Sequence, residues 1–162
     1  MAQMDYKGTG RIHSFRGNLE DGSTSTQRWQ DKIRIQGPVG DVAWRITKLE
    51  LIPQGIGTAD TENLVMVWRE EQDPTTTAPN SIDFRNDELL AAGFFGANTQ
   101  GTAELTAVVF DNALFVRNIW VTHYDHSTNQ NINYYIEIEE VKVSKAGMAQ
   151  LALAAARRLE EK

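Results

Sequence analysis

The chain has 162 residues, a length typical of one domain, and it contains no cysteine, which excludes disulfides, zinc–thiolate sites and thiol catalysis. Its 22 acidic and 16 basic side chains give a formal net charge of −6, which argues against a surface that tracks phosphates throughout. No stretch reaches the roughly 18 apolar residues that a membrane-spanning helix needs. The first residues lack the apolar run of a secretory signal.

The first half of the chain alternates between apolar and polar side chains, which predicts half-buried β-strands. Strands are expected at residues 10–15, 29–36, 42–52 and 64–68, separated by loops at 17–26, 37–41, 53–63 and 73–80. In the third strand the apolar parity changes after Ile46, which predicts a β-bulge near Thr47 and Lys48. The fourth strand is apolar at every position, so it is expected to be buried on both faces.

A polar interruption with a short helix is predicted in the middle of the chain. Residues 86–93 carry Asn86 or Asp87 as a helix N-cap and Gly93 as the residue that ends the last turn. A short strand at 81–84 is expected just before them.

The last third predicts strands at 104–110, 114–124 and 132–143, with a polar hairpin loop at 125–131. A second parity change predicts another bulge near Glu139 and Glu140.

Strong helix formers follow Ser144, which is a good N-cap. One apolar stripe at helical spacing contains Met148, Leu151, Ala152, Ala155 and Leu159, and Leu153 lies off it. We therefore expect a β-sandwich domain over residues 1–144 and a C-terminal amphipathic helix over 145–162.

Candidate metal and catalytic residues are few. His123 and His126 are three residues apart, so a continuous strand points them to opposite sides; with His13 they converge only if the turn begins at Asp125. Two exposed loop histidines are favoured over a metal site. Ser127 beside His126 and Asp125 has the composition of a triad without its geometry. The sequence predicts no catalytic residue, no cofactor and no metal site. It predicts that the protein is not an enzyme.

Other chemical signals favour structural interpretations. The tryptophans at 29, 44, 68 and 120 lie inside apolar runs, which favours core packing over sugar stacking. The carboxylate pairs at 70–71, 139–140 and 160–161 are adjacent residues, and adjacent strand residues face opposite sides of a sheet. A thin basic cluster near the N-terminus is too short for strong nucleic-acid binding; it consists of Lys7, Arg11, His13 and Arg16.

About eight strands separated by turn signals predict an all-β, antiparallel β-sandwich. The segment Leu114-Phe-Val-Arg-Asn-Ile-Trp-Val-Thr-His-Tyr124, the loop after it, and Asn133-Tyr-Tyr-Ile-Glu-Ile-Glu-Glu-Val-Lys-Val143 resemble the final strand pair of single jelly-roll capsid proteins of phages and archaeal viruses. The resemblance implies a jelly roll with a short mid-chain helix and a C-terminal helix. It also implies a virion structural protein that assembles with copies of itself, with or without other virion proteins.

Other functions stay open. A carbohydrate- or receptor-binding module of the same fold predicts exposed polar and aromatic side chains at one loop tip, for example Tyr124, Asp125, Asn129 and Asn131. A tail or decoration component of a virion is a close variant of the capsid interpretation, and a small β-barrel enzyme ranks last. The C-terminal helix either packs across a subunit boundary or caps its own sandwich.

Overall fold

The computed structural model describes residues 8–21, 28–35, 42–55, 60–73, 80–98, 100, 102–126 and 130–160. The predicted turn at 37–41 and most of the predicted loop at 73–80 lie outside these residues, as do Lys7, Ser127 and Asn129.

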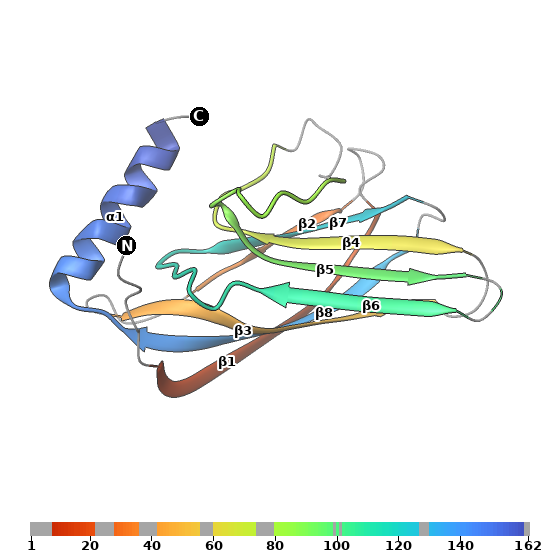
Figure 1. Ribbon diagram of the computed structural model, residues 1–162, viewed down its shortest axis with the longest axis horizontal. Helices are drawn as coiled ribbons and strands as arrows, with labels where there is room; N and C mark the ends of the chain where they lie inside the picture. The colour runs from red at the N-terminus through yellow and green to blue at the C-terminus, as the bar shows by residue number, and fades with distance from the viewer. Residues whose placement is uncertain are drawn as a thin grey trace.

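In the described residues, eight strands precede one helix (Figure 1). They are β1 (Gly8–Leu19), β2 (Gln30–Ile33), β3 (Val42–Pro53), β4 (Thr61–Trp68), β5 (Leu89–Ala97), β6 (Ala103–Val109), β7 (Ile119–Asp125), β8 (Ile132–Lys142) and α1 (Lys145–Glu160).

The strands form two antiparallel sheets. The three-stranded sheet has the order β1-β8-β3, and the five-stranded sheet has the order β2-β7-β4-β5-β6. The first strand thus pairs with the last and the second with the seventh, a nested arrangement typical of a jelly roll. β6 stays hydrogen-bonded to β5 and approaches β3 across the sandwich. This confirms the predicted all-β, antiparallel jelly-roll fold.

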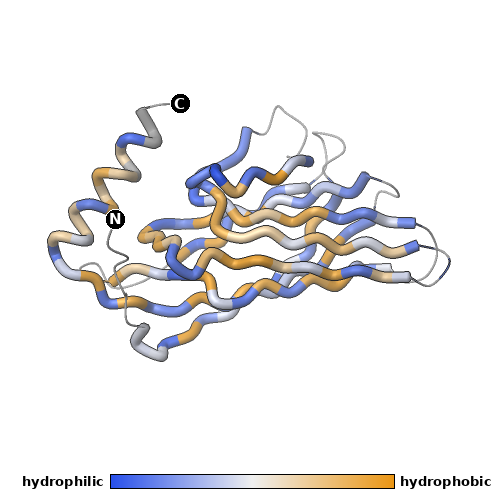
Figure 2. Tube along the Cα trace, in the orientation of Figure 1, coloured by the Kyte–Doolittle hydropathy of each residue, from blue (hydrophilic) through white to orange (hydrophobic). Residues whose placement is uncertain are grey.

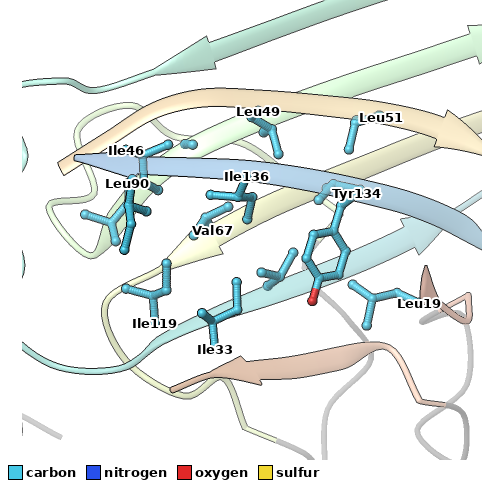
Figure 3. Close-up of a cluster of buried hydrophobic side chains, with 14 of the residues drawn as sticks. Leu19, Ile33, Ile46, Leu49, Leu51, Val67, Leu90, Ile119, Tyr134 and Ile136 are labelled. Atoms are coloured by element: carbon cyan, nitrogen blue, oxygen red, sulfur yellow. The ribbon is translucent and has the colours of Figure 1, made fainter. Parts of the chain in front are cut away.

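The main core lies between the two sheets, and Figure 3 shows side chains from both meeting there. In Figure 2 hydrophobic and hydrophilic residues both occur along the strands, which fits half-buried strands with one face toward the core. The predicted bulge in β3 is confirmed: the pairing with β8 shifts between Ile46 and Lys48, leaving Thr47 as the extra residue. The bulge lets Ile46 and Leu49 both face the core.

Strand β4 is buried on both faces, as predicted. Val65 and Val67 face the main core, whereas Met66 and Trp68 belong to a second apolar cluster on the other face. In the described part of the connection between β4 and β5, Phe84 meets Phe110 edge-to-face with ring centroids 5.1 Å apart, and Phe110 packs against this second cluster.

The predicted mid-chain helix is wrong. Residues 89–97 form β5, which is hydrogen-bonded to β4 on one side and β6 on the other. Asn86 supplies a local turn instead of a cap, because its side-chain oxygen accepts the Glu88 N–H at 3.0 Å and its carbonyl accepts the Leu89 N–H at 3.2 Å. The strand predicted at 81–84 is also absent, since these exposed residues are irregular or in a turn.

The predicted bulge at Glu139 and Glu140 is also wrong. β8 keeps a regular register with β3 there, and the irregularity lies in β1, between Gly8 and Ile12. The parity changes because this end of β8 is covered on its outer face as well. Val141 and Val143 pack there in a third apolar cluster with Ala43 and Leu114, against Met148 and Leu151 of α1.

Helix α1 begins where the sequence predicts. The Gly147 N–H donates to the Ser144 side-chain oxygen at 3.1 Å, and the Met148 N–H donates to the Ser144 carbonyl at 2.9 Å. Ser144 is therefore the N-cap. The division of the chain into a sandwich domain and a separate C-terminal helix stays a prediction.

Candidate functional site

The three histidines lie in separate environments. His13 is exposed on β1, with its ring edge against Trp44 at 5.1 Å between centroids. His126 is exposed and its ring stacks on that of Tyr124 at 6.4 Å. His123 is only 1% exposed, so the prediction of an exposed loop histidine is wrong there, because β7 continues through residue 125 and turns this side chain inwards.

His123 belongs to a buried polar network. Its Nδ1 lies 2.9 Å from the Glu20 carbonyl oxygen, and its Nε2 lies 2.8 Å from the Asn63 side-chain amide oxygen. The Asn63 Nδ2 in turn donates to the Thr61 hydroxyl oxygen at 2.7 Å. Burial lowers the pKa of His123 below its ordinary value. Both ring nitrogens lie within hydrogen-bonding distance of oxygen atoms of the protein, so His123 has a structural role in linking these segments.

Two buried aspartates extend the network. Asp21 accepts the Asp125 backbone N–H at 2.8 Å, and the Asp125 carboxylate accepts the Gln130 N–H at 2.9 Å and the Thr61 hydroxyl at 3.3 Å. Because Asp21 follows β1 while Asp125 ends β7, these bonds join the two sheets. Asp125 is therefore unavailable as an exposed ligand-binding group.

Within the described ranges, no group of three or more His, Asp or Glu side chains is placed to hold a metal ion. The same part of the chain has no helix long and apolar enough to cross a membrane.

Most of the tryptophans pack in the interior, as predicted. Trp29, Trp44 and Trp68 are buried, and half-buried Trp120 lies under the Lys32 ammonium at 5.4 Å from the ring centroid. The Trp68 indole N–H donates to the Thr122 hydroxyl at 2.9 Å.

Of the residues named for sugar binding at the loop tip, Asn129 lies outside the described residues and Asp125 is buried. Tyr124 is half-buried, and the Asn131 amide donates to Asn18 at 3.0 Å.

A groove that the sequence did not indicate lies on the outer face of the three-stranded sheet. It is lined by Arg16, Asn18, Glu50, Ile52, Asn133 and Tyr135, among others. These residues come from three strands, and Asn133 pairs with both Asn18 and Ile52 across the sheet. Pairing of distant strands brings them together, so no local pattern signals the groove.

Two edge strands expose both of their faces. All side chains from Thr9 to Ser14 on β1 are exposed, and so are all those from Ala103 to Ala107 on β6. Each stretch carries one large apolar side chain, Ile12 at 56% and Leu105 at 55% exposure. The described part of the predicted basic cluster, namely Arg11, His13 and Arg16, is exposed on β1.

Helix α1 leaves the sandwich instead of lying along it. Met148 and Leu151 near its start pack on the third apolar cluster, and Leu151 also lines a small cleft with Arg69 and Glu70. Figure 1 shows the C-terminal turns of α1 pointing away from both sheets. Leu153 is 54% exposed and, as predicted, lies off the packed stripe.

No protein-family model and no curated protein matches the sequence. Among solved structures, VP1 of Trichodysplasia spinulosa-associated polyomavirus is similar, with 9% sequence identity and a TM-score of 0.50. The match covers 89% of this chain and 100% of that chain. At this identity the likeness is one of fold, and it supports the resemblance to viral jelly-roll capsid proteins.

Proposed function

We propose that this protein is a virion structural protein, a capsid subunit that assembles with copies of itself and has no enzymatic activity. The observation that carries the proposal is the jelly-roll likeness to VP1, a viral capsid protein, over nearly the whole of both chains. Fold likeness alone does not fix a function, so the proposal also depends on features of this chain.

Two such features support assembly. Helix α1, whose C-terminal turns point away from the sandwich, carries Leu153 at 54% exposure, and the β1 and β6 edges leave backbone groups and apolar side chains open. A row of unpaired strand groups and exposed apolar side chains is a ready surface for another chain. In a shell the sandwich would act as a rigid block, and many lateral contacts would set the symmetry.

Contact with nucleic acid is proposed to be weak or absent. The chain has a net charge of −6, and the described basic cluster on β1 has only Arg11, His13 and Arg16. Strong binding needs many phosphate contacts.

The test is the mass of the purified protein in solution over a range of salt and pH, measured by light scattering and followed by negative-stain electron microscopy. Closed particles or rings are the expected result. A monomer under every condition would overturn assembly by this chain alone. A single defined oligomer too small for a shell would instead favour a tail or decoration component.

A second candidate is a carbohydrate- or receptor-binding module, and the outer groove favours it. Tyr135 is half-buried there beside Asn18, Glu50 and Arg16, a mixture of aromatic, amide and charged groups that suits a sugar. If the protein is strictly monomeric in the mass measurement, the binding module becomes the favoured function. Loss of glycan binding in Tyr135→Ala would then locate the site.

A further inference from the structure

The described residues have four edge strands, β1, β3, β2 and β6, and two of them, β1 and β6, differ in charge and lie on opposite sides of the sandwich. β1 ends the three-stranded sheet on the side where it contacts β2, whereas β6 ends the five-stranded sheet on the side where it contacts β3. Neither strand has a hydrogen-bonded neighbour on its outer side among the described residues.

Parts of β1 and β6 are exposed on both faces, which is unusual for strands of a sandwich. A strand at the edge of a sandwich normally buries one face and alternates, as β3 does along most of its length. In contrast, the stretches 9–14 of β1 and 103–107 of β6 are exposed on both faces. Each lies at a sheet edge and carries one large exposed apolar side chain, a combination that natural proteins usually avoid. In β1 the pairing is irregular between Gly8 and Ile12, and the Arg11 N–H donates to the Thr9 hydroxyl oxygen at 3.3 Å, so the outer backbone groups from Ile12 onward are the ones available to another strand.

The charges of the two edges are complementary. β1 carries Arg11, His13 and Arg16 and no acidic residue. β6 carries Glu104 and no basic residue, and Asp60 and Glu62 line the same groove as Glu104 further from the edge, where Glu62 belongs to β4. A β1 edge meeting another β1 would bring like charges together, and the same holds for two β6 edges.

We infer that β1 of one copy adds to the β6 edge of a second copy, so that a continuous sheet crosses the subunit boundary. The main-chain hydrogen bonds supply the attraction, the opposite charges select the partner edge, and Ile12 and Leu105 become buried. Because each copy offers one edge of each kind on opposite sides, the contact is head-to-tail and closes into rings when the rotation per copy allows. The strand pairing rests on the proposed capsid function and specifies its interface.

Cysteine cross-linking tests this pairing, since the natural chain has no cysteine to interfere. Chains carrying Ile12→Cys are mixed with chains carrying Leu105→Cys and oxidised with glutathione disulfide. We expect a covalent dimer in the mixture and little in either variant alone. Because neighbouring strand positions face opposite sides, His13→Cys and Thr106→Cys are included to sample the other face.

Ile52→Cys is the matched control, because Ile52 is a large exposed apolar residue on the outer face of β3, an edge strand that takes no part in the proposed pairing. Its mixture with Leu105→Cys should remain uncross-linked. If all β1–β6 mixtures stay uncross-linked within particles that do form, the strand pairing is wrong and the capsid proposal stands. If the protein stays monomeric throughout, both are wrong.

Charge reversal gives an independent readout. Glu104→Lys should lose assembly, and combining it with Arg11→Glu and Arg16→Glu in the same chain should restore assembly, because the edges are again complementary. Assembly of Glu104→Lys at the natural level would contradict the charge selection.

Discussion

At the scale of single residues, His123 links stability to pH. Burial lowers its pKa in the folded protein, while the unfolded chain retains the ordinary value near 6.5. Between those two values the unfolded state binds more protons, so the free energy of unfolding falls as the pH drops below about 6.5 and is fully retained above it. Denaturant unfolding from pH 8 to pH 5 should show this loss, with a slope of at most about 1.4 kcal/mol per pH unit from this residue.

The matched control is His13→Gln, because His13 is exposed and lies outside the network. This variant should keep the pH dependence of the natural protein, whereas His123→Gln should flatten it below about pH 6.5. Equal slopes in the two variants would mean that other groups cause the acid sensitivity.

Two neighbouring tyrosines on β8 should respond differently to loss of their hydroxyl groups. The Tyr134 hydroxyl is buried and donates to the Asp31 carboxylate on β2 at 3.1 Å, which joins the two sheets; burial and the nearby carboxylate raise its pKa. Tyr134→Phe should lower the free energy of unfolding by about 1–2 kcal/mol, because a hydrogen bond to a charged group is lost.

Tyr135 is the control, since its hydroxyl donates to Glu137 on the outer face. Tyr135→Phe should change the free energy of unfolding by less than about 0.5 kcal/mol. Denaturant midpoints of the two variants, measured side by side, check both values. Equal effects would show that the contact to Asp31 does not stabilise the packing of the sheets.

Some residue-level roles could be predicted and others could not. Ser144 is recognisable as an N-cap because a cap and its helix are adjacent in the sequence. The burial of His123 was missed because its partners include the carbonyl of Glu20, more than one hundred residues earlier. Contacts of that kind arise from the fold and leave no local signal.

At the scale of elements, α1 offers a test of its role in assembly. Its first two turns pack on the sandwich through Met148 and Leu151, and the later turns point away (Figure 1). Deleting residues 152–162 should leave the free energy of unfolding nearly unchanged and abolish or weaken particles. Deleting 146–162 should disperse the protein as well, with some loss of stability because the third apolar cluster is uncovered.

Sedimentation velocity and denaturant unfolding on the same samples separate the two effects. Leu159 and Ala155 of the predicted stripe have side chains outside the described set, so the truncation is preferred to point changes there. Unchanged particles after removal of 152–162 would assign α1 to its own subunit alone.

Element prediction succeeded where the order of apolar and polar residues within one strand carries the information. β4 was predicted to be buried on both faces because all five of its last residues are apolar, and the bulge in β3 was predicted because its parity changes. Residues 86–93 were wrongly predicted as a helix, because Asn86 and Gly93 are residue types that are common at the two ends of helices. Pairing with β4 and β6 then overrode local propensity, as it often does for a buried central strand.

At the scale of the whole molecule, the sandwich and its two-sheet character followed from strand number and spacing, but the order of strands did not. Nothing near Leu19 indicates that it pairs with Ile132. The exposed stretch of β6 likewise reads as an ordinary strand, and only the sheet order shows that it lies at an edge. The proposed interface was therefore visible only in three dimensions.

The central position of β8 has a consequence for how the protein is made. β8 is the last of the described strands, and within the described residues it is the only strand to which β1 and β3 are bonded. Neither can be paired until the ribosome has delivered residues 132–142, and such long-range pairing makes folding slow, on a scale of milliseconds to seconds. Prematurely terminated chains consequently never complete the three-stranded sheet. Under the proposed strand pairing, they would be excluded from growing particles.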